Sequence, residues 1–140
     1  MIESTVIQGR GFHNLVNDNN EVIGFQVCMS PHYYRGMWLS QFRPGNLIVD
    51  GEEYGKDVVT WELYGKKYTV DQMSTETKIW WQLPDLATIK VKKPGGLSQG
   101  YHEITIHFGY INNYIAPDNW NPDYGVNFNG FEHKKRLIIV

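Results

Sequence analysis

The alternation of apolar and polar side chains with a period of two constrains this fold more than any other feature. Phe25, Val27 and Met29 alternate with polar or small residues, and the same pattern recurs at 89–92 and 103–108. Successive side chains of a β-strand point to opposite faces, so each run predicts a strand with one apolar face. Runs rich in β-branched and aromatic residues at 58–64 and 137–140 suit the same pleated surface.

Turn signals separate these runs at short intervals. Asp50-Gly51 and Gly65-Lys66 predict two-residue hairpins, because glycine adopts positive φ without steric cost. Further turns are expected at 17–20, at Pro44-Gly45 and at 94–96, the last as a hairpin connection. One short helical turn is expected at 70–77, with Asp71 as its cap. The predicted fold class is all-β: an antiparallel β-sandwich or jelly-roll-like single domain over residues 1–140.

Composition narrows the classes of partner. A chain of 140 residues with 13 basic and 15 acidic residues lacks the concentrated basic face that nucleic acid requires. The basic cluster 134–136 is interpreted as the solvated start of the last strand. No stretch approaches the roughly 18 apolar residues of a membrane span. The single Cys28 is expected to be a buried structural thiol, and the absence of disulfides and of a signal peptide predicts a cytoplasmic protein.

The residues of this chain do not form a recognisable catalytic motif. His102 and His107 are an odd number of positions apart, so on one regular strand they point to opposite faces and cannot share a metal. No serine lies in a nucleophile elbow, and Gly95-Gly96 does not lead into a helix as a phosphate loop does. A carboxylate pair for glycoside hydrolysis stays open, because such pairs are distant in the chain. We therefore expect no catalytic residue and no metal site on this chain.

Two aromatic segments stand outside the strand pattern. The first spans 31–38 and contains Tyr33, Tyr34, Arg35 and Trp38, residue types that anchor protein interfaces and stack on sugar or flavonoid-like rings. The second is a predicted long loop insertion at 112–132, which contains Trp120, Tyr124 and Phe128. Loops of that length are usually functional or disordered, and the aromatic content argues against disorder. Each segment is either packed on its own sandwich or docks a partner or ligand.

The sequence also resembles the small, or β, subunit of bacterial C-glycoside deglycosidases. The resemblance covers roughly residues 4–108 and rests on short stretches that occur in the family's order. They are Gln8-Gly9-Arg10-Gly11-Phe12, Gly24-Phe25-Gln26-Val27, Tyr33-Tyr34-Arg35-Gly36, Val49-Asp50-Gly51-Glu52, Tyr68-Thr69-Val70-Asp71, Trp80, Lys93-Pro94-Gly95-Gly96-Leu97 and Gly100-Tyr101-His102-Glu103. Because the family has a shorter connection before its last strand, the resemblance implies nothing about 112–132.

The resemblance implies a division of labour. Such enzymes cleave the carbon–carbon bond between a 3-oxo-glucosyl group and an aromatic, flavonoid-type aglycone, by proton abstraction beside the oxo group and elimination. The large α subunit, a TIM barrel similar to sugar isomerases, holds the acid/base groups and a divalent metal, typically manganese. The small subunit is a β-sandwich that carries no cofactor and is required for activity. In this interpretation Tyr33, Tyr34, Arg35, Trp38, Trp120, Tyr124 and Phe128 line the partner interface or the substrate mouth.

Two other function classes stay open. A stand-alone carbohydrate-binding β-sandwich is the main alternative, because Trp and Tyr faces stack on sugar rings. An independent cupin-like enzyme is the weaker one, since the histidine spacing does not suit a metal site.

Overall fold

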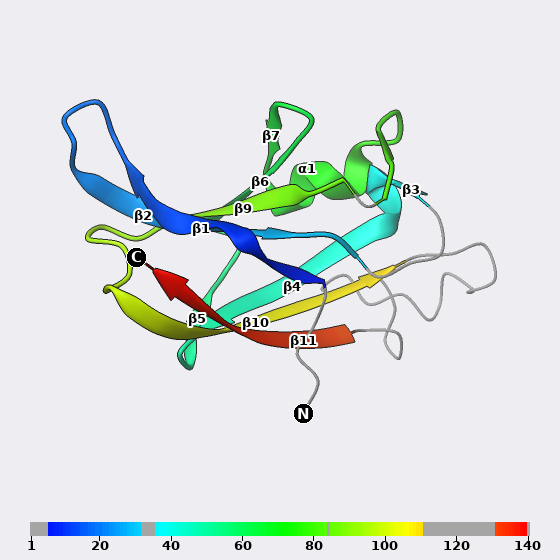
Figure 1. Ribbon diagram of the computed structural model, residues 1–140. Helices are drawn as coiled ribbons and strands as arrows, with labels where there is room; N and C mark the ends of the chain where they lie inside the picture. Colours follow the sequence, from blue (N-terminus) through cyan, green and yellow to red (C-terminus); the bar gives the residue numbers. More distant parts are fainter. Residues whose placement is uncertain (1–5, 32–35, 84, 111–130, 140) are drawn as a thin grey trace.

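A computed structural model describes residues 6–31, 36–83, 85–110 and 131–139. Two antiparallel sheets form the body, and a small two-stranded sheet lies at one end (Figure 1). The five-stranded sheet has the order β1 (Ile7–Val16), β2 (Val22–Met29), β9 (Ala87–Lys92), β6 (Val59–Leu63) and β7 (Lys66–Tyr68). The four-stranded sheet has the order β11 (Phe131–Ile139), β10 (Gly100–Tyr110), β4 (Phe42–Val49) and β5 (Glu52–Tyr54). The small sheet pairs β3 (Met37–Trp38) with β8 (Trp80–Trp81).

The apolar faces of the two large sheets share one core. Phe25 on β2 meets Tyr54 on β5 with ring centroids 5.4 Å apart, and Phe42 on β4 meets Trp61 on β6 at 5.3 Å. The alternating residues predicted to face inward are buried in this core, as is Trp61. The free Cys28 is also buried, but outside this core, with its sulfur 3.5 Å from Thr88 Oγ1. The all-β sandwich is therefore confirmed, and apolar burial on this scale is the main source of its stability.

Two predicted hairpin turns differ in their accuracy. Asp50-Gly51 does connect β4 to β5, and both residues have positive φ, 52° and 84°. The turn between β6 and β7 is Tyr64-Gly65 instead of Gly65-Lys66, with φ of 52° and 79°. Lys66 is paired with Leu63, so it already belongs to the ladder.

The predicted turn at Pro44-Gly45 is wrong, because both residues lie inside β4. Phe108 pairs with Pro44 and Ile106 pairs with Leu47, so two residues of β4 oppose the single His107. This is a β-bulge, a position that tolerates proline because the regular ladder is already interrupted there.

The predicted hairpin at 94–96 is also wrong, since β9 and β10 belong to different sheets and the connection crosses between them. The side chain of Asn14 holds the crossing segment: its Oδ1 accepts from the Leu97 N–H at 2.8 Å, and its Nδ2 donates to the Leu97 carbonyl at 2.8 Å. A Cβ on Gly96 would lie 2.5 Å from the Asn14 Oδ1. Glycine is thus required where the backbone passes the Asn14 amide.

Replacing Asn14 with alanine is expected to lower the free energy of unfolding by about 2 kcal/mol, because it leaves both polar groups of Leu97 without their partner. Urea denaturation measures the loss. Asn19→Ala, an exposed change in the neighbouring β1–β2 turn, is the control and should stay within about 0.5 kcal/mol of wild type. Equal stability of the two variants would contradict the role of Asn14.

The expected helical turn exists as α1 (Val70–Thr75), but its cap is Thr69 and not Asp71. Thr69 Oγ1 accepts from the Gln72 N–H at 3.1 Å, and Gln72 Oε1 accepts from the Thr69 N–H at 2.9 Å. This reciprocal capping box satisfies two backbone donors at the helix start. Asp71 lies in the first turn and pairs with Lys56 at 3.3 Å.

Within the described ranges, no helix is long and apolar enough to cross a bilayer.

The C-terminal strand begins earlier than expected. Phe131 and Glu132 are the first residues of β11, so the predicted loop 112–132 is two residues too long at its C-terminal end. The basic cluster 134–136 lies within β11, paired with β10, and not at the start of the strand; Lys134 and Arg136 are exposed. Residues 112–130 lie outside the described ranges.

Candidate functional site

Described residues next to both predicted aromatic segments lie at one end of the sandwich. In the small sheet, Trp38 pairs with Trp80. A short 3-10 turn, η1 (Leu39–Gln41), connects Trp38 to Phe42, the first residue of β4. Tyr110, the last residue of β10, pairs with Phe42. The start of β11 pairs with the same part of β10, so the end of β10, the start of β11 and the start of β4 lie together at one end of the sandwich, near β3 (Figure 1).

Of the predicted site residues, the structure describes only Trp38. The others, Tyr33, Tyr34, Arg35, Trp120, Tyr124 and Phe128, lie outside the described ranges.

Trp38 and Trp80 form an exposed aromatic pair. Their side chains are 44% and 37% exposed, and the ring centroids lie 5.1 Å apart at an interplanar angle of 80°. Gly36 permits this arrangement, because a Cβ there would lie 2.7 Å from Trp80 Nε1 and 2.6 Å from the Trp81 carbonyl oxygen. Trp81 points to the opposite face, is fully buried, and donates its Nε1–H to the Asp85 carbonyl at 2.8 Å.

A third exposed ring, Tyr64, is held beside this pair by hydrogen bonds. Its hydroxyl donates to Asp85 Oδ2 at 2.7 Å and accepts from the Gln82 N–H at 3.0 Å. Gln82 Oε1 in turn accepts from Trp80 Nε1 at 3.1 Å. Partial desolvation of the phenol and the hydrogen bond to Asp85 raise the pKa of Tyr64, so its phenol stays a neutral donor. We name the aromatic patch as Trp38, Tyr64, Trp80 and the neighbouring exposed Leu86.

The sequence interpretation missed most of this patch. Trp80 was noted only as part of the resemblance, and Tyr64 and Asp85 were not singled out. One signal was available: Trp80 and Trp81 are adjacent, and adjacent residues of a strand point to opposite faces. One of the two indoles therefore had to face outward. The links through Gln82 and Tyr64 are distant in sequence and carry no local signal.

At the opposite end of the sandwich, the buried His102 is hydrogen-bonded to Asp50 and Ser98. We call these three residues the His102 clasp. His102 Nδ1 lies 2.5 Å from Asp50 Oδ2, and Nε2 lies 2.7 Å from the Ser98 carbonyl oxygen. Burial lowers the pKa of His102, but the hydrogen bonds to Ser98 and Asp50 outweigh it and the net pKa is raised. Since both ring nitrogens face acceptors, the arrangement favours the protonated imidazole, which donates from both sides. Asp50 Oδ1 also accepts from the Glu103 N–H at 2.8 Å.

The predicted separation of the two histidines is confirmed. His102 is buried on the inner face of β10, whereas His107 Nε2 bonds Glu132 Oε2 on the outer face at 2.8 Å. In the parts of the chain that the structure describes, no three His, Cys, Asp or Glu side chains gather as a metal site would require.

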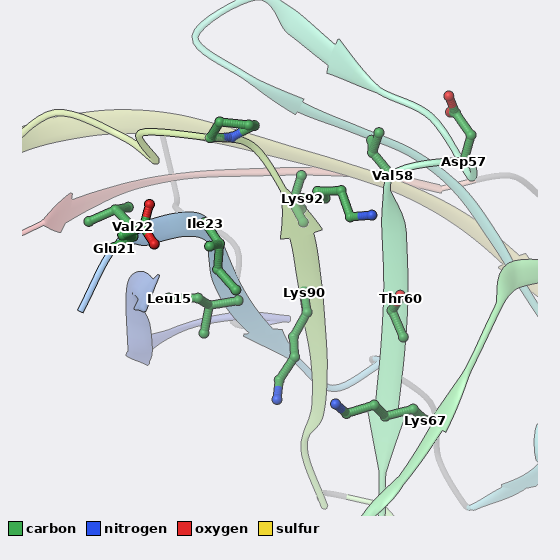
Figure 2. Close-up of a pocket in the computed structure, with 12 residues that line it drawn as sticks. Leu15, Glu21, Val22, Ile23, Asp57, Val58, Thr60, Lys67, Lys90 and Lys92 are labelled. Carbon is green, nitrogen blue, oxygen red and sulfur yellow. The ribbon is translucent and has the colours of Figure 1, made fainter. Parts of the chain in front are cut away.

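A shallow depression lies on the outer face of the five-stranded sheet. Figure 2 shows Lys90 of β9 and Lys67 of β7, the strands on either side of β6, extending toward the same open space. Lys90 is paired with Glu62 at 2.9 Å. None of the residues that line the depression is aromatic, so it provides no ring for sugar stacking; they are Leu15, Glu21, Val22, Ile23, Asp57, Val58, Thr60, Lys67, Lys90, Val91, Lys92 and Pro94.

Comparisons with known proteins agree with the resemblance seen in the sequence. Residues 2–114 match the family described as C-glycoside deglycosidase beta subunit. A protein of that name from Eubacterium cellulosolvens is 42% identical over 147 aligned residues, which cover 99% of this chain and all of the relative. The family match contains the whole aromatic patch and the His102 clasp. The chain therefore belongs to the family of C-glycoside deglycosidase beta subunits.

Proposed function

We propose that this chain is the accessory, non-catalytic subunit of a heteromeric enzyme that cleaves C-glycosides. The observation that carries the proposal is the match to the beta-subunit family over residues 2–114, because a beta subunit implies a partner subunit. The substrate of the complex is a 3-oxo C-glucoside with an aromatic, flavonoid-type aglycone. The reaction breaks the carbon–carbon bond between sugar and aglycone.

In this proposal the chemistry resides on the partner. A large TIM-barrel α subunit, similar to sugar isomerases, provides the acid/base groups and a divalent metal such as manganese, and proton removal beside the oxo group leads to elimination of the aglycone. Two observations on this chain support the division. His102 has both ring nitrogens engaged by Ser98 and Asp50, so it is not available as a base. The exposed aromatic patch is suited to recognition and carries no nucleophile. We place the complex in the cytoplasm, where a free buried thiol such as Cys28 stays reduced.

Co-expression with the large subunit tests the proposal. We expect the two chains to purify together as one hetero-oligomer in native mass spectrometry, and the isolated small chain to leave a 3-oxo C-glucoside intact. Two chains that purify apart, or a small chain that cleaves the substrate alone, would show the proposal to be wrong.

A stand-alone carbohydrate-binding module is the second candidate, favoured by the exposed Trp38 and Trp80 rings. The geometry supports it less, because rings at 80° to each other cannot provide one flat platform for successive sugars. Titration with soluble glucans, followed by tryptophan fluorescence, distinguishes a carbohydrate-binding module from an accessory subunit. A saturable change would favour the module, and no response would count against it.

A further inference from the structure

We propose that the aromatic patch is the surface on which the large subunit docks, with Trp38 and Trp80 as its energetic centre. This inference rests on the proposed accessory function and adds the location of the interface. It is argued from described residues alone and does not depend on segments 32–35 and 111–130.

The patch has the residue types that dominate interface energetics. A few Trp, Tyr and Arg residues usually carry most of the binding energy of a protein interface. Trp38, Tyr64 and Trp80 are 44%, 52% and 37% exposed, and contacts connect them into one surface. Tyr101 is even more exposed, at 69%, but lies on the outer face of the four-stranded sheet beneath the Arg136 guanidinium.

The patch is also fixed in position before any partner arrives. Gly36 allows the Trp80 indole to lie against the backbone, and Gln82 and Asp85 hold Trp80 and Tyr64 through hydrogen bonds. Tyr64 keeps a positive φ of 52°, which is strained for a bulky side chain and persists only where the surroundings hold it. Binding therefore orders few side chains, and preorganisation of this kind favours affinity.

The large subunit fits this surface better than other occupants. The family is defined as the beta subunit of an enzyme, so a partner chain is expected on some face. A flat sugar surface is disfavoured by the perpendicular rings. A second copy of this chain is the remaining occupant, and the test below includes it.

The test measures binding to the immobilised large subunit by biolayer interferometry. We expect Trp38→Ala and Trp80→Ala each to raise the Kd by about 30-fold, the range of interface hot spots. Tyr64→Phe keeps the ring but removes its bonds to Gln82 and Asp85, and should raise the Kd by only about three- to tenfold. Tyr101→Ala, an exposed aromatic change on another face, is the matched control and should stay within about twofold.

Hydroxyl-radical footprinting of the wild-type chains gives a second measurement that needs no variant to fold. We expect Trp38 and Trp80 to lose reactivity in the complex and Tyr101 to keep it. Wild-type affinity of both tryptophan variants, or unchanged reactivity of both indoles in the complex, would overturn the docking surface while leaving the accessory function intact. Protection of the patch by self-association of the small chain would also overturn it. Failure of the wild-type chains to bind at all would instead refute the accessory function.

Discussion

Replacing Gly24 with alanine is expected to lower the free energy of unfolding by about 3 kcal/mol or more. Gly24 lies on β2, where it pairs with Lys92 of β9. A Cβ at this position would lie 1.9 Å from the Val91 carbonyl oxygen, which belongs to the backbone of the adjacent strand. No side-chain rotation relieves this contact, so the β2–β9 ladder itself must shift.

Gly9→Ala is the matched control. Its Cβ would meet only the Leu137 Cδ2, at the ordinary distance of 3.8 Å, and Gly9 is not among the residues with positive φ. We expect this variant to stay within about 0.5 kcal/mol of wild type. Chemical denaturation measures both variants, and a Gly24→Ala protein as stable as Gly9→Ala would contradict the geometry described.

Replacing His102 with alanine is expected to lower the free energy of unfolding by about 3 kcal/mol near pH 6, because it removes two charge-assisted hydrogen bonds and leaves the Ser98 carbonyl without its donor. The clasp joins the β4–β5 turn, the segment before β10 and β10 itself. Phe12 of β1, in the other sheet, lies edge to face with the imidazole, with ring centroids 6.2 Å apart, so the substitution also removes a contact between the two sheets.

The difference between wild type and His102→Ala should depend on pH. The folded pKa of His102 is raised, so its contribution is fully present below its unfolded pKa of about 6.5 and is lost as pH rises through the folded pKa. Burial raises the pKa of Asp50, but its bonds to His102 and Glu103 lower the net pKa. The contribution of Asp50 is therefore present above about pH 3.9 and is lost as pH falls through the folded pKa.

Urea denaturation at a series of pH values tests this dependence. The stability difference should be largest between about pH 4 and 6.5 and should narrow on both sides. His13→Ala, a change of an exposed histidine, serves as the control and should lie within about 0.5 kcal/mol of wild type. A difference that is constant across this range would show that His102 contributes only its packing.

Strands β2, β6, β9, β10 and β11 were predictable because a period of two, or a run of β-branched and aromatic residues, indicates a strand whatever the order of strands in the sheet. Strands β1 and β4 lack this regular alternation and were not predicted. Connections were less predictable. Pro44-Gly45 has the composition of a turn, yet β4 continues through it. Strand β10 pairs with β4 on both sides of this position, so it forms a bulge. The segment 94–96 has the composition of a hairpin, yet β9 and β10 pair with different partners, and strand pairing is a property of the whole chain.

The candidate site was predictable only in part. Composition and resemblance together identified Trp38, but its partner Trp80 is distant in sequence, and the hydrogen bonds that fix Tyr64 form only in the folded chain. The comparisons confirm the family that the resemblance indicated, whereas the site residues that it implied stay predictions. Asp50, Gly96 and His102 all lie in the stretches that carried it, and the structure uses them to hold the far end of the sandwich together.

Titration of the isolated large subunit with this chain tests the central claim most directly. Cleavage of a 3-oxo C-glucoside is followed at a fixed concentration of large subunit while the small chain is added. The account predicts little activity without the small chain, a rise as it is added, and saturation at a fixed molar ratio. Full activity of the large subunit alone, unchanged by the small chain, would contradict it.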